Sequence, residues 1–136
     1  MQLIDTHTHL FTEEFDDDRE AVVQEALAAG VVAMLLPNID TQSIAPLWAL
    51  HEKYPKHCLP MAGLHPTSVD AGYPAALDRV KAELATRNYF GVGEIGIDLY
   101  WDKTYAAQQK EAFARQIEWA RAYDLPFVIH ARESYP

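Results

Sequence analysis

Residues 18–36 read DREAVVQEALAAGVVAMLL, and this stretch decides the fold class. Its first part, residues 18–29, places valine, alanine and leucine side chains on one side of a helix. Gly30 comes next and suits the left-handed position that follows the end of a helix. Residues 31–36 then form a short apolar run, which is typical of a strand buried on both faces. The stretch therefore predicts a helix followed by a strand of a parallel sheet.

The same alternation of short apolar runs and longer helical patterns continues along the chain. We predict five strands, at residues 2–6, 31–36, 58–64, 90–95 and 126–130. In the helices between them, Thr41 is expected to cap the second, and Arg121 is expected on the inward face of the fourth beside Phe113, Ile117 and Ala120. Strands that alternate with helices form parallel sheets with crossover helices.

The spacing of the strands points to one barrel domain. The repeat is about 30 residues, which is the spacing of a TIM-type (β/α)8 barrel with eight units in roughly 250 residues. Residues 1–136 would then hold the first four βα units and the fifth strand, the N-terminal part of a single barrel domain that is truncated. A smaller doubly wound sheet is the alternative, but no glycine-rich phosphate loop follows the first strand.

Composition narrows the function classes. The formal net charge is −9, which argues against binding nucleic acid through a broad basic face. A compact cluster of divalent metals could still hold a phosphate locally. Cys58 is the only cysteine, so a reducing compartment is expected. No apolar run is long enough to cross a membrane, and we expect a soluble cytoplasmic protein.

Two histidines lie two residues apart at the end of the first predicted strand. His7 and His9 therefore project from one face and can converge on one ion. Neutral imidazole is a ligand for zinc and other divalent transition metals. Asp5 precedes the pair and could accept the hydrogen bond that fixes the orientation of a ring. For this pair alone, a polar strand end in solvent is the alternative.

A carboxylate interrupts the fourth predicted strand, in the segment GVGEIG at residues 91–96. A buried carboxylate is costly unless it is paired or binds a metal. The flanking glycines leave room beside the strand for another group to approach. Because its two oxygens can bridge two ions, Glu94 is predicted to be a bridging metal ligand and the central catalytic residue. A structural ion pair with an arginine is the alternative.

Other candidate residues follow the remaining strands. His130 ends the fifth strand and is a candidate metal ligand, and His65 follows the third strand as a candidate for substrate binding. Arg132 can offer a planar fork to a phosphodiester oxygen, with an ion pair to Glu133 or Asp98 as the alternative. Asp98 could support a metal ligand or cap the next loop. These residues share the carboxyl ends of predicted strands, where barrel active sites are built.

Four further side chains receive weaker predictions. Tyr100 and Trp101, in the loop after the fourth strand, either line the substrate cleft or pack against the fold. His51 and His57 lie on a helix and a turn, and we expect them to face solvent.

Four segments carry a family resemblance. They are Ile4-Asp5-Thr6-His7-Thr8-His9, Gly63-Leu64-His65-Pro66, Gly93-Glu94-Ile95-Gly96-Ile97-Asp98 and Ile129-His130-Ala131-Arg132. Together with Gln108, Gln109, Phe113 and Gln116 in the fourth helix, they resemble the TatD family of metal-dependent deoxyribonucleases over the whole chain. The joint occurrence is specific, whereas His-x-His alone would fit any related amidohydrolase.

The resemblance implies a (β/α)8 barrel with two or more divalent ions, of zinc, magnesium or manganese, that hydrolyses phosphodiester bonds of DNA. By this analogy His7 and His9 bind one ion, Glu94 bridges, and His130 binds the second. Family members add a histidine from the next strand and an aspartate from the last, and both are expected to be absent from this chain. The complete protein is expected to be a monomer.

Two alternatives differ in function class. A related amidohydrolase acting on an ester, lactone or amide would use the same histidines, although no lysine stands at a predicted strand end. A half-barrel that is inactive by itself and self-associates is the other alternative, because the first and fifth strands would both present open edges.

Overall fold

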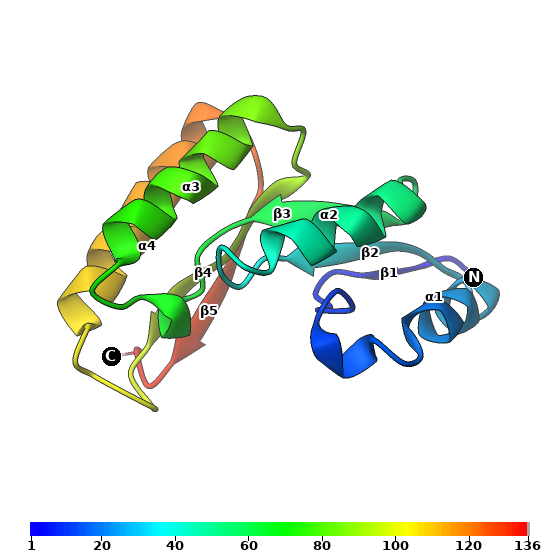
Figure 1. Ribbon diagram of the computed structural model, residues 1–136, viewed down its shortest axis with the longest axis horizontal. Coiled ribbons are helices and arrows are strands. Elements are labelled where there is room, and N and C mark those ends of the chain that lie inside the picture. Colours follow the sequence, from blue (N-terminus) through cyan, green and yellow to red (C-terminus); the bar gives the residue numbers. More distant parts are fainter. Residues whose placement is uncertain (136) are drawn as a thin grey trace.

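The short apolar runs form the strands of one curved parallel sheet (Figure 1). The computed structural model describes residues 1–135, and Pro136 lies outside the described residues. The strands are β1 (Leu3–Asp5), β2 (Val31–Pro37), β3 (Cys58–Ala62), β4 (Gly91–Asp98) and β5 (Phe127–Arg132). They lie side by side in chain order, and every neighbouring pair is parallel. This is the arrangement of four βα units and the fifth strand of a (β/α)8 barrel, so the predicted fold class is confirmed.

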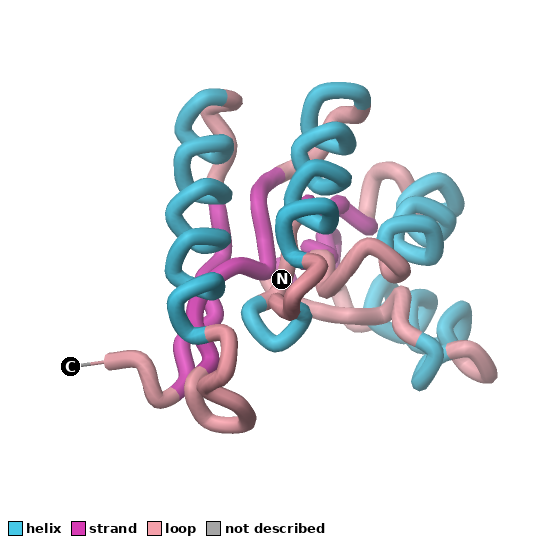
Figure 2. The backbone as a smooth tube through the Cα atoms, turned by 60° about the vertical axis from the view of Figure 1, so that its left-hand side comes forward, coloured by secondary structure: helices cyan, strands magenta, loops and turns pink. Residues whose placement is uncertain are grey.

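The connecting segments run along one side of the sheet. They are α1 (Arg19–Ala28), α2 (Ile44–Lys53), α3 (Tyr73–Thr86) and α4 (Ala106–Ala122), with short 3-10 helices η1 (Glu13–Phe15) and η2 (Pro66–Ser68). Helix α1 contacts β2, α2 contacts β3, and α4 contacts both β4 and α3 (Figures 1 and 2). No helix in the described part of the chain is long and apolar enough to cross a membrane.

The hydrophobic core lies between the sheet and these helices. Leu36, Val92 and Ile95 from the strands are fully buried, as is Leu77 from α3. Helix α4 presents a mixed inward face, which consists of Gln109, Ala112, Gln116, Trp119 and Ala120. The prediction that Arg121 shares this face is wrong, because Arg121 is exposed. At 100° per residue, the position after Ala120 turns away from the sheet.

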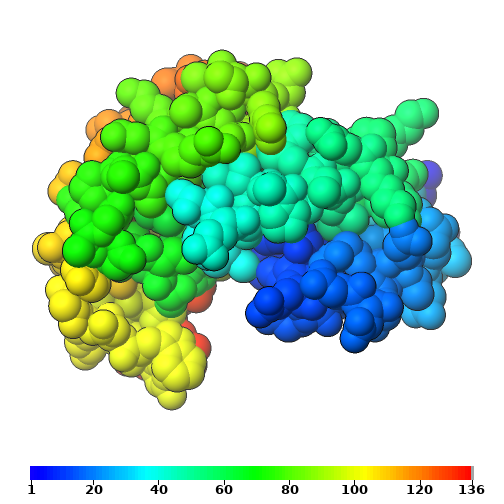
Figure 3. Space-filling model, in the orientation of Figure 1, coloured from blue at the N-terminus to red at the C-terminus, as the bar shows by residue number. Residues whose placement is uncertain are grey.

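The two outer strands expose apolar side chains. In β1 the side chain of Ile4 is 61% exposed, and in β5 that of Ile129 is 52% exposed. Each of these strands pairs with one neighbour only in the described sheet. A wide recess in the molecular surface separates the N-terminal segment, drawn in blue, from the loop after β4, drawn in yellow (Figure 3).

Several predicted boundaries and environments need correction. Strand β4 runs on to Asp98, so Glu94 lies in the middle of its strand and not at the end. The α2 helix is preceded by Asp40, whose carboxylate accepts from the backbone N–H groups of Gln42 and Ser43. The prediction that Thr41 caps this helix is wrong, because the N-cap position is Ser43, and Asp40 closes the turn that precedes it.

The prediction that His51 and His57 face solvent is also wrong. Both side chains are partly buried. The Nδ1 atom of His51 lies 2.7 Å from the carbonyl oxygen of Cys58, and that of His57 lies 2.8 Å from the carbonyl oxygen of Val32. Both rings donate to backbone carbonyls near the start of the sheet, a structural use far from the carboxyl ends of the strands.

Candidate metal centre

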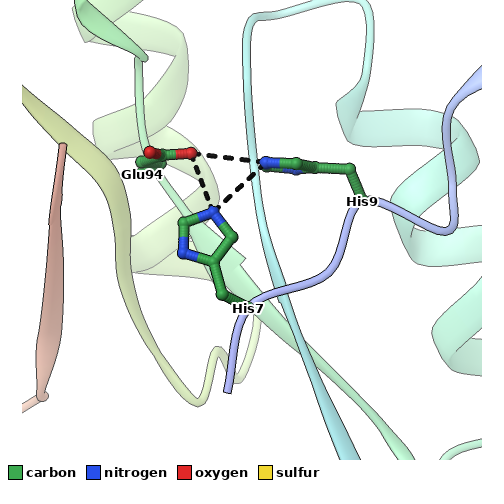
Figure 4. A group of neighbouring side chains, drawn as sticks. All are labelled: His7, His9 and Glu94. Carbon is green, nitrogen blue, oxygen red and sulfur yellow. Dashed lines mark hydrogen bonds and ion pairs between the residues drawn. The ribbon is translucent and has the colours of Figure 1, made fainter. Parts of the chain in front are cut away.

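Two histidines from the N-terminal segment meet a carboxylate from β4 (Figure 4). Nε2 of His7 lies 3.0 Å from Oε2 of Glu94, and Nε2 of His9 lies 3.3 Å from the same oxygen. The two Nε2 atoms are 3.3 Å apart. The three ligand atoms thus converge on one point, although 87 residues separate His7 from Glu94.

The hydrogen bond on the far side of the His9 ring decides its protonation. Nδ1 of His9 lies 3.0 Å from the carbonyl oxygen of Pro37, and a carbonyl can only accept, so Nδ1 carries the proton. In the neutral ring, Nε2 then presents a lone pair toward the carboxylate of Glu94. Two acceptors that face each other repel unless a proton or a metal ion lies between them.

A second group of ligand atoms surrounds the other oxygen of Glu94. Nδ1 of His130 lies 3.0 Å from Oε1 of Glu94, and Nε2 of His65 lies 3.7 Å from it. Nε2 of His130 lies 2.8 Å from Oδ2 of Asp98, a carboxylate that is almost fully buried. Because Nε2–H of His130 donates to Asp98, the neutral ring carries its proton on Nε2 and presents the lone pair of Nδ1 to Glu94.

His65 differs from the other three histidines. Its Nδ1 accepts a hydrogen bond from the backbone N–H of Thr67 at 3.1 Å. The neutral ring therefore carries its proton on Nε2, which lies 3.2 Å from Nδ1 of His130. In its neutral form His65 is thus a hydrogen-bond donor toward the centre.

The electrostatic surroundings keep the central carboxylates ionised. Burial by itself would raise the pKa of Glu94, which is 6% exposed. The surrounding rings of His65, His9 and His7 outweigh burial, because in their protonated form they donate to the carboxylate and offset its charge, and they hold the pKa far below its ordinary value. Burial also acts to raise the pKa of Asp98, and it is outweighed by the hydrogen bonds from the backbone N–H of Tyr100 and from His130, so that this pKa is lowered. Both groups are anions that can hold a cation.

Backbone contacts position Glu94 within the sheet. The backbone N–H of Glu94 donates to the carbonyl oxygen of Asn38 at 3.0 Å, and the N–H of Asn38 donates to that of Gly93 at 2.8 Å. The side-chain amide of Asn38 also donates to the carbonyl oxygen of Gly63. The buried Asn38, which follows β2, therefore forms hydrogen bonds both to β4 and to the residue that follows β3. Sequence reasoning missed it, although an asparagine directly after a buried strand is a usable signal.

The glycines around Glu94 admit neighbouring backbone and not a ligand. A Cβ on Gly63 would come within 2.6 Å of the backbone of Gly93. Gly96 has a φ of +149°, and a Cβ there would lie 1.9 Å from the carbonyl oxygen of His130. The room that the sequence indicated beside Glu94 is thus occupied by strands β3 and β5, which bring the ligand-bearing segments close together.

Two buried glutamines of α4 hold the segments that carry the site. Gln116 bonds both the N–H and the carbonyl of Leu64, the residue before His65. Gln109 bonds the N–H and the carbonyl of Asp98 in the same way, at 2.8 and 3.0 Å. Both glutamines belong to the family resemblance, which implied no role for them. In the structure they fix the backbone next to His65 and at Asp98.

Two predicted residues have partners other than those expected. The carboxylate of Asp5 accepts from the backbone N–H of His7 at 3.0 Å, and it is exposed. Asp5 thus orders the chain before the ligand pair rather than an imidazole. The guanidinium of Arg132 lies over the ring of Tyr100, and it forms no ion pair with Glu133 or Asp98 within residues 1–135.

The donor set fits two divalent ions. Two groups of side chains could each hold an ion, His7 and His9 with Glu94, and His65 and His130 with Glu94; within each group the possible ligand atoms lie within 4.8 Å of one another. In the second group Nε2 of His65 could serve as a ligand only after losing the proton that it carries in the neutral ring described above. Neutral imidazole nitrogens with a bridging carboxylate suit zinc and similar divalent metals.

Comparison with known proteins agrees with this geometry. The sequence model of the family described as "TatD related DNase" matches residues 4–136. The chain is 32% identical over 136 residues to the "Uncharacterized metal-dependent hydrolase YjjV" of Escherichia coli, covering 98% of this chain and 52% of the relative. It is 30% identical over 133 residues to the "3′-5′ ssDNA/RNA exonuclease TatD" of Salmonella typhimurium, covering 98% and 51%.

Solved structures show the same fold. The crystal structure of the TatD homologue YjjV from Escherichia coli superposes with a TM-score of 0.87 at 33% identity, over 97% of this chain and 51% of that one. A TatD family hydrolase from Entamoeba histolytica superposes with a TM-score of 0.74 at 20% identity, over 98% and 51%. The chain spans about half the length of the relatives that it matches. The chain belongs to the TatD-related DNase family, a family of metal-dependent hydrolases.

Proposed function

We propose that the protein acts through a two-metal centre to hydrolyse phosphodiester bonds of DNA. The observation that carries this proposal is the division of the Glu94 carboxylate, whose Oε2 faces His7 and His9 and whose Oε1 faces His130. A carboxylate that is shared in this way could hold two ions, and two-metal sites of this kind serve phosphoester hydrolysis.

The proposed ions are zinc, manganese or magnesium, held by His7, His9, Glu94 and His130. When bound, they supply an activated water at neutral pH and positive charge for the oxygens of the transition state. The chain itself would do three things. Asp98 holds the ring of His130 so that Nδ1 points inward, His65 offers its Nε2–H to a phosphate oxygen, and Glu94 stays anionic.

Nucleic acid is the proposed substrate class. The Salmonella typhimurium relative is named as an exonuclease of single-stranded DNA and RNA. This name supports a phosphodiester, rather than a carboxylic ester, as the bond that is cleaved. The net charge of −9 supports local recognition at the centre over binding along a basic surface.

An amidohydrolase acting on a lactone, ester or amide is the second candidate. A lysine or cysteine between the metals would favour it, but within residues 1–135 the ion-pair partners of Glu94 are all histidines. Cys58 lies at the start of β3, and burial raises the pKa of its thiol to about 11, so that it is a poor nucleophile and ligand. The donor set thus favours phosphodiester hydrolysis.

The test compares substrates and one matched pair of variants. Purified protein with Mn²⁺ or Zn²⁺ is assayed on a single-stranded DNA oligonucleotide and, in parallel, on a lactone. We expect cleavage of the oligonucleotide that a chelator abolishes. Glu94→Gln should lose at least about a hundredfold, as expected when a group that stabilises the transition state is removed. Glu118→Gln, on the exposed side of α4, should keep full activity. Lactone hydrolysis without DNA cleavage would replace the proposal by the second candidate.

A further inference from the structure

Two exposed aromatic rings and a guanidinium stack together beside the metal centre. The guanidinium carbon of Arg132 lies 3.8 Å from the centroid of the Tyr100 ring and 5.3 Å from the Trp101 ring. The two rings meet edge to face, with centroids 4.8 Å apart and planes at 88°. Tyr100 is 52% exposed and Trp101 is 71% exposed. We refer to Tyr100, Trp101 and Arg132 as the stacking ledge.

The ledge is fixed to the centre through one carboxylate. Oδ1 of Asp98 accepts from the backbone N–H of Tyr100 at 3.0 Å, while its Oδ2 faces Nε2 of His130 at 2.8 Å. Further along the loop, Asp102 accepts from the backbone N–H and the hydroxyl of Thr104. The rings are therefore held in a defined place next to the ligands.

A small cavity of about 190 Å³ opens beside Trp101, between η2 and the loop after β4. Its walls include Thr67, Tyr105 and three carboxylates, those of Asp70, Asp98 and Asp102. Acidic walls repel phosphate and accept hydrogen bonds from N–H donors. A flat aromatic group with ring N–H or amine donors fits both the cavity and the ring beside it.

We propose that the stacking ledge and this cavity bind an unpaired nucleobase of the nucleic-acid strand whose phosphodiester reaches the metal centre. This inference rests on the proposed function and names how the strand is held. Every base has a face that stacks on aromatic rings and on an arginine plane, so the recognition is general for sequence. Stacking also needs no basic surface, which agrees with a chain of net charge −9.

Binding is measured without turnover, so that hydrolysis and base recognition are tested separately. The probes are trithymidylate with hydrolysis-resistant phosphorothioate linkages and a chain of the same length and linkage that lacks bases, both with Mg²⁺. Quenching of tryptophan fluorescence reports binding, because Trp101 is far more exposed than the buried Trp119. Thymidine monophosphate serves as a third probe.

We expect trithymidylate to bind at least about fivefold more tightly than the abasic chain, the lower end of the range for one stacked base. Trp101→Ala should lose this preference, with binding followed by anisotropy of a labelled strand, and Trp101→Phe should retain most of it. Tyr123→Ala removes an exposed ring just after the end of α4 and should change nothing.

Three results would overturn the inference: equal affinity for the abasic chain, an unchanged preference in Trp101→Ala, or tighter binding of the monophosphate than of the strand. Base-dependent binding in a protein that cleaves no DNA would instead overturn the proposed hydrolysis and leave the stacking ledge in place.

Discussion

The side-chain amide of Gln116 pairs with both backbone groups of Leu64. Its Oε1 accepts from the Leu64 N–H at 2.7 Å, and its Nε2 lies 3.3 Å from the Leu64 carbonyl oxygen. The amide thereby supplies the two hydrogen bonds that a neighbouring strand would supply, at a residue that lies after the end of β3 and directly before His65. Both partners are buried, so no water competes for these bonds.

Replacing Gln116 by leucine should leave the N–H and carbonyl of Leu64 without partners. We expect a loss of about 1–3 kcal/mol in the free energy of unfolding, the cost of unpaired buried polar groups. Urea unfolding measures it. Gln108→Leu, about two turns before Gln116 on the same helix and only partly buried, should cost much less. Equal losses in the two variants would show that the hydrogen bonds between Gln116 and Leu64 do not stabilise the fold.

Gly96→Ala should disrupt the pairing of β4 with β5. The φ of +149° is a conformation that L side chains rarely adopt, and the new Cβ would collide with the carbonyl of His130. We expect a loss of at least about 2 kcal/mol in unfolding free energy. The control is Gly72→Ala, since Gly72 has a φ of −88° and the nearest atom to a new Cβ, at 3.2 Å, belongs to the carboxylate of Asp70, a side chain that can shift. A stable Gly96→Ala protein with unchanged metal binding would contradict the geometry.

Acid should destabilise the wild-type protein through Glu94. Its folded pKa lies below the ordinary value of 4.5, so ionised Glu94 favours the folded state above about pH 4.5. That contribution is lost progressively as the pH falls from there toward the folded pKa. Urea unfolding in a chelator, between about pH 7 and pH 3, should therefore show a steeper loss below pH 4.5 than Glu94→Gln shows. If the unfolding free energies of the two proteins fell equally with pH, the acid sensitivity would not come from Glu94.

Metal should bind in two separable steps. Each ion should stabilise the folded chain by about 2.7 kcal/mol at a free concentration of about 100 Kd. His9→Ala and His130→Ala should each lose one equivalent of zinc, because these residues belong to different ligand groups, and Glu94→Gln should weaken both. Elemental analysis and thermal unfolding measure this. His51→Ala, which removes a histidine on α2, should keep both equivalents.

Residues 1–136 by themselves should self-associate through β1 and β5. Ile4 and Ile129 are exposed on these outer strands, and an unpaired apolar strand edge favours pairing with another chain. Light scattering of the wild type should show species larger than a monomer, and Ile4→Thr with Ile129→Thr should reduce them. Tyr123→Ser is the matched control. A monodisperse wild-type monomer at high concentration would contradict this prediction.

Sequence patterns predicted the strands well where apolar runs coincide with pairing. The second strand was expected at residues 31–36 and lies at Val31–Pro37. The fourth was expected to end at Ile95, because Gly96 and Asp98 are residues that strands disfavour. It continues because Gly96 pairs with His130 and Asp98 with Arg132, partners more than thirty residues away. Local patterns carry no information about such pairing.

The convergence of His7, His9 and His65 could also be predicted, since they follow the carboxyl ends of β1 and β3, which share one edge of the sheet. Glu94 and His130 lie inside β4 and β5, which the sequence patterns did not indicate. The finer arrangement could not be predicted either. The direction of the His65 ring depends on the N–H of Thr67, and the placement of Asp98 depends on Gln109. Glu94 turns one oxygen to each histidine group through side-chain torsions that sequence alone does not specify. Asn38 was missed for the same reason.

The distance along the chain between His7 and Glu94 has a consequence for folding. In the sheet, β2 and β3 lie between β1 and β4, so His7 and Glu94 are brought together by the pairing of all four strands. Contacts of such long range form late and slowly compared with helices. A coloured ion such as cobalt, added during refolding, would therefore mark the moment at which the sheet is assembled across its first four strands. The colour of the bound ion would thus report the rate at which these long-range strand contacts form.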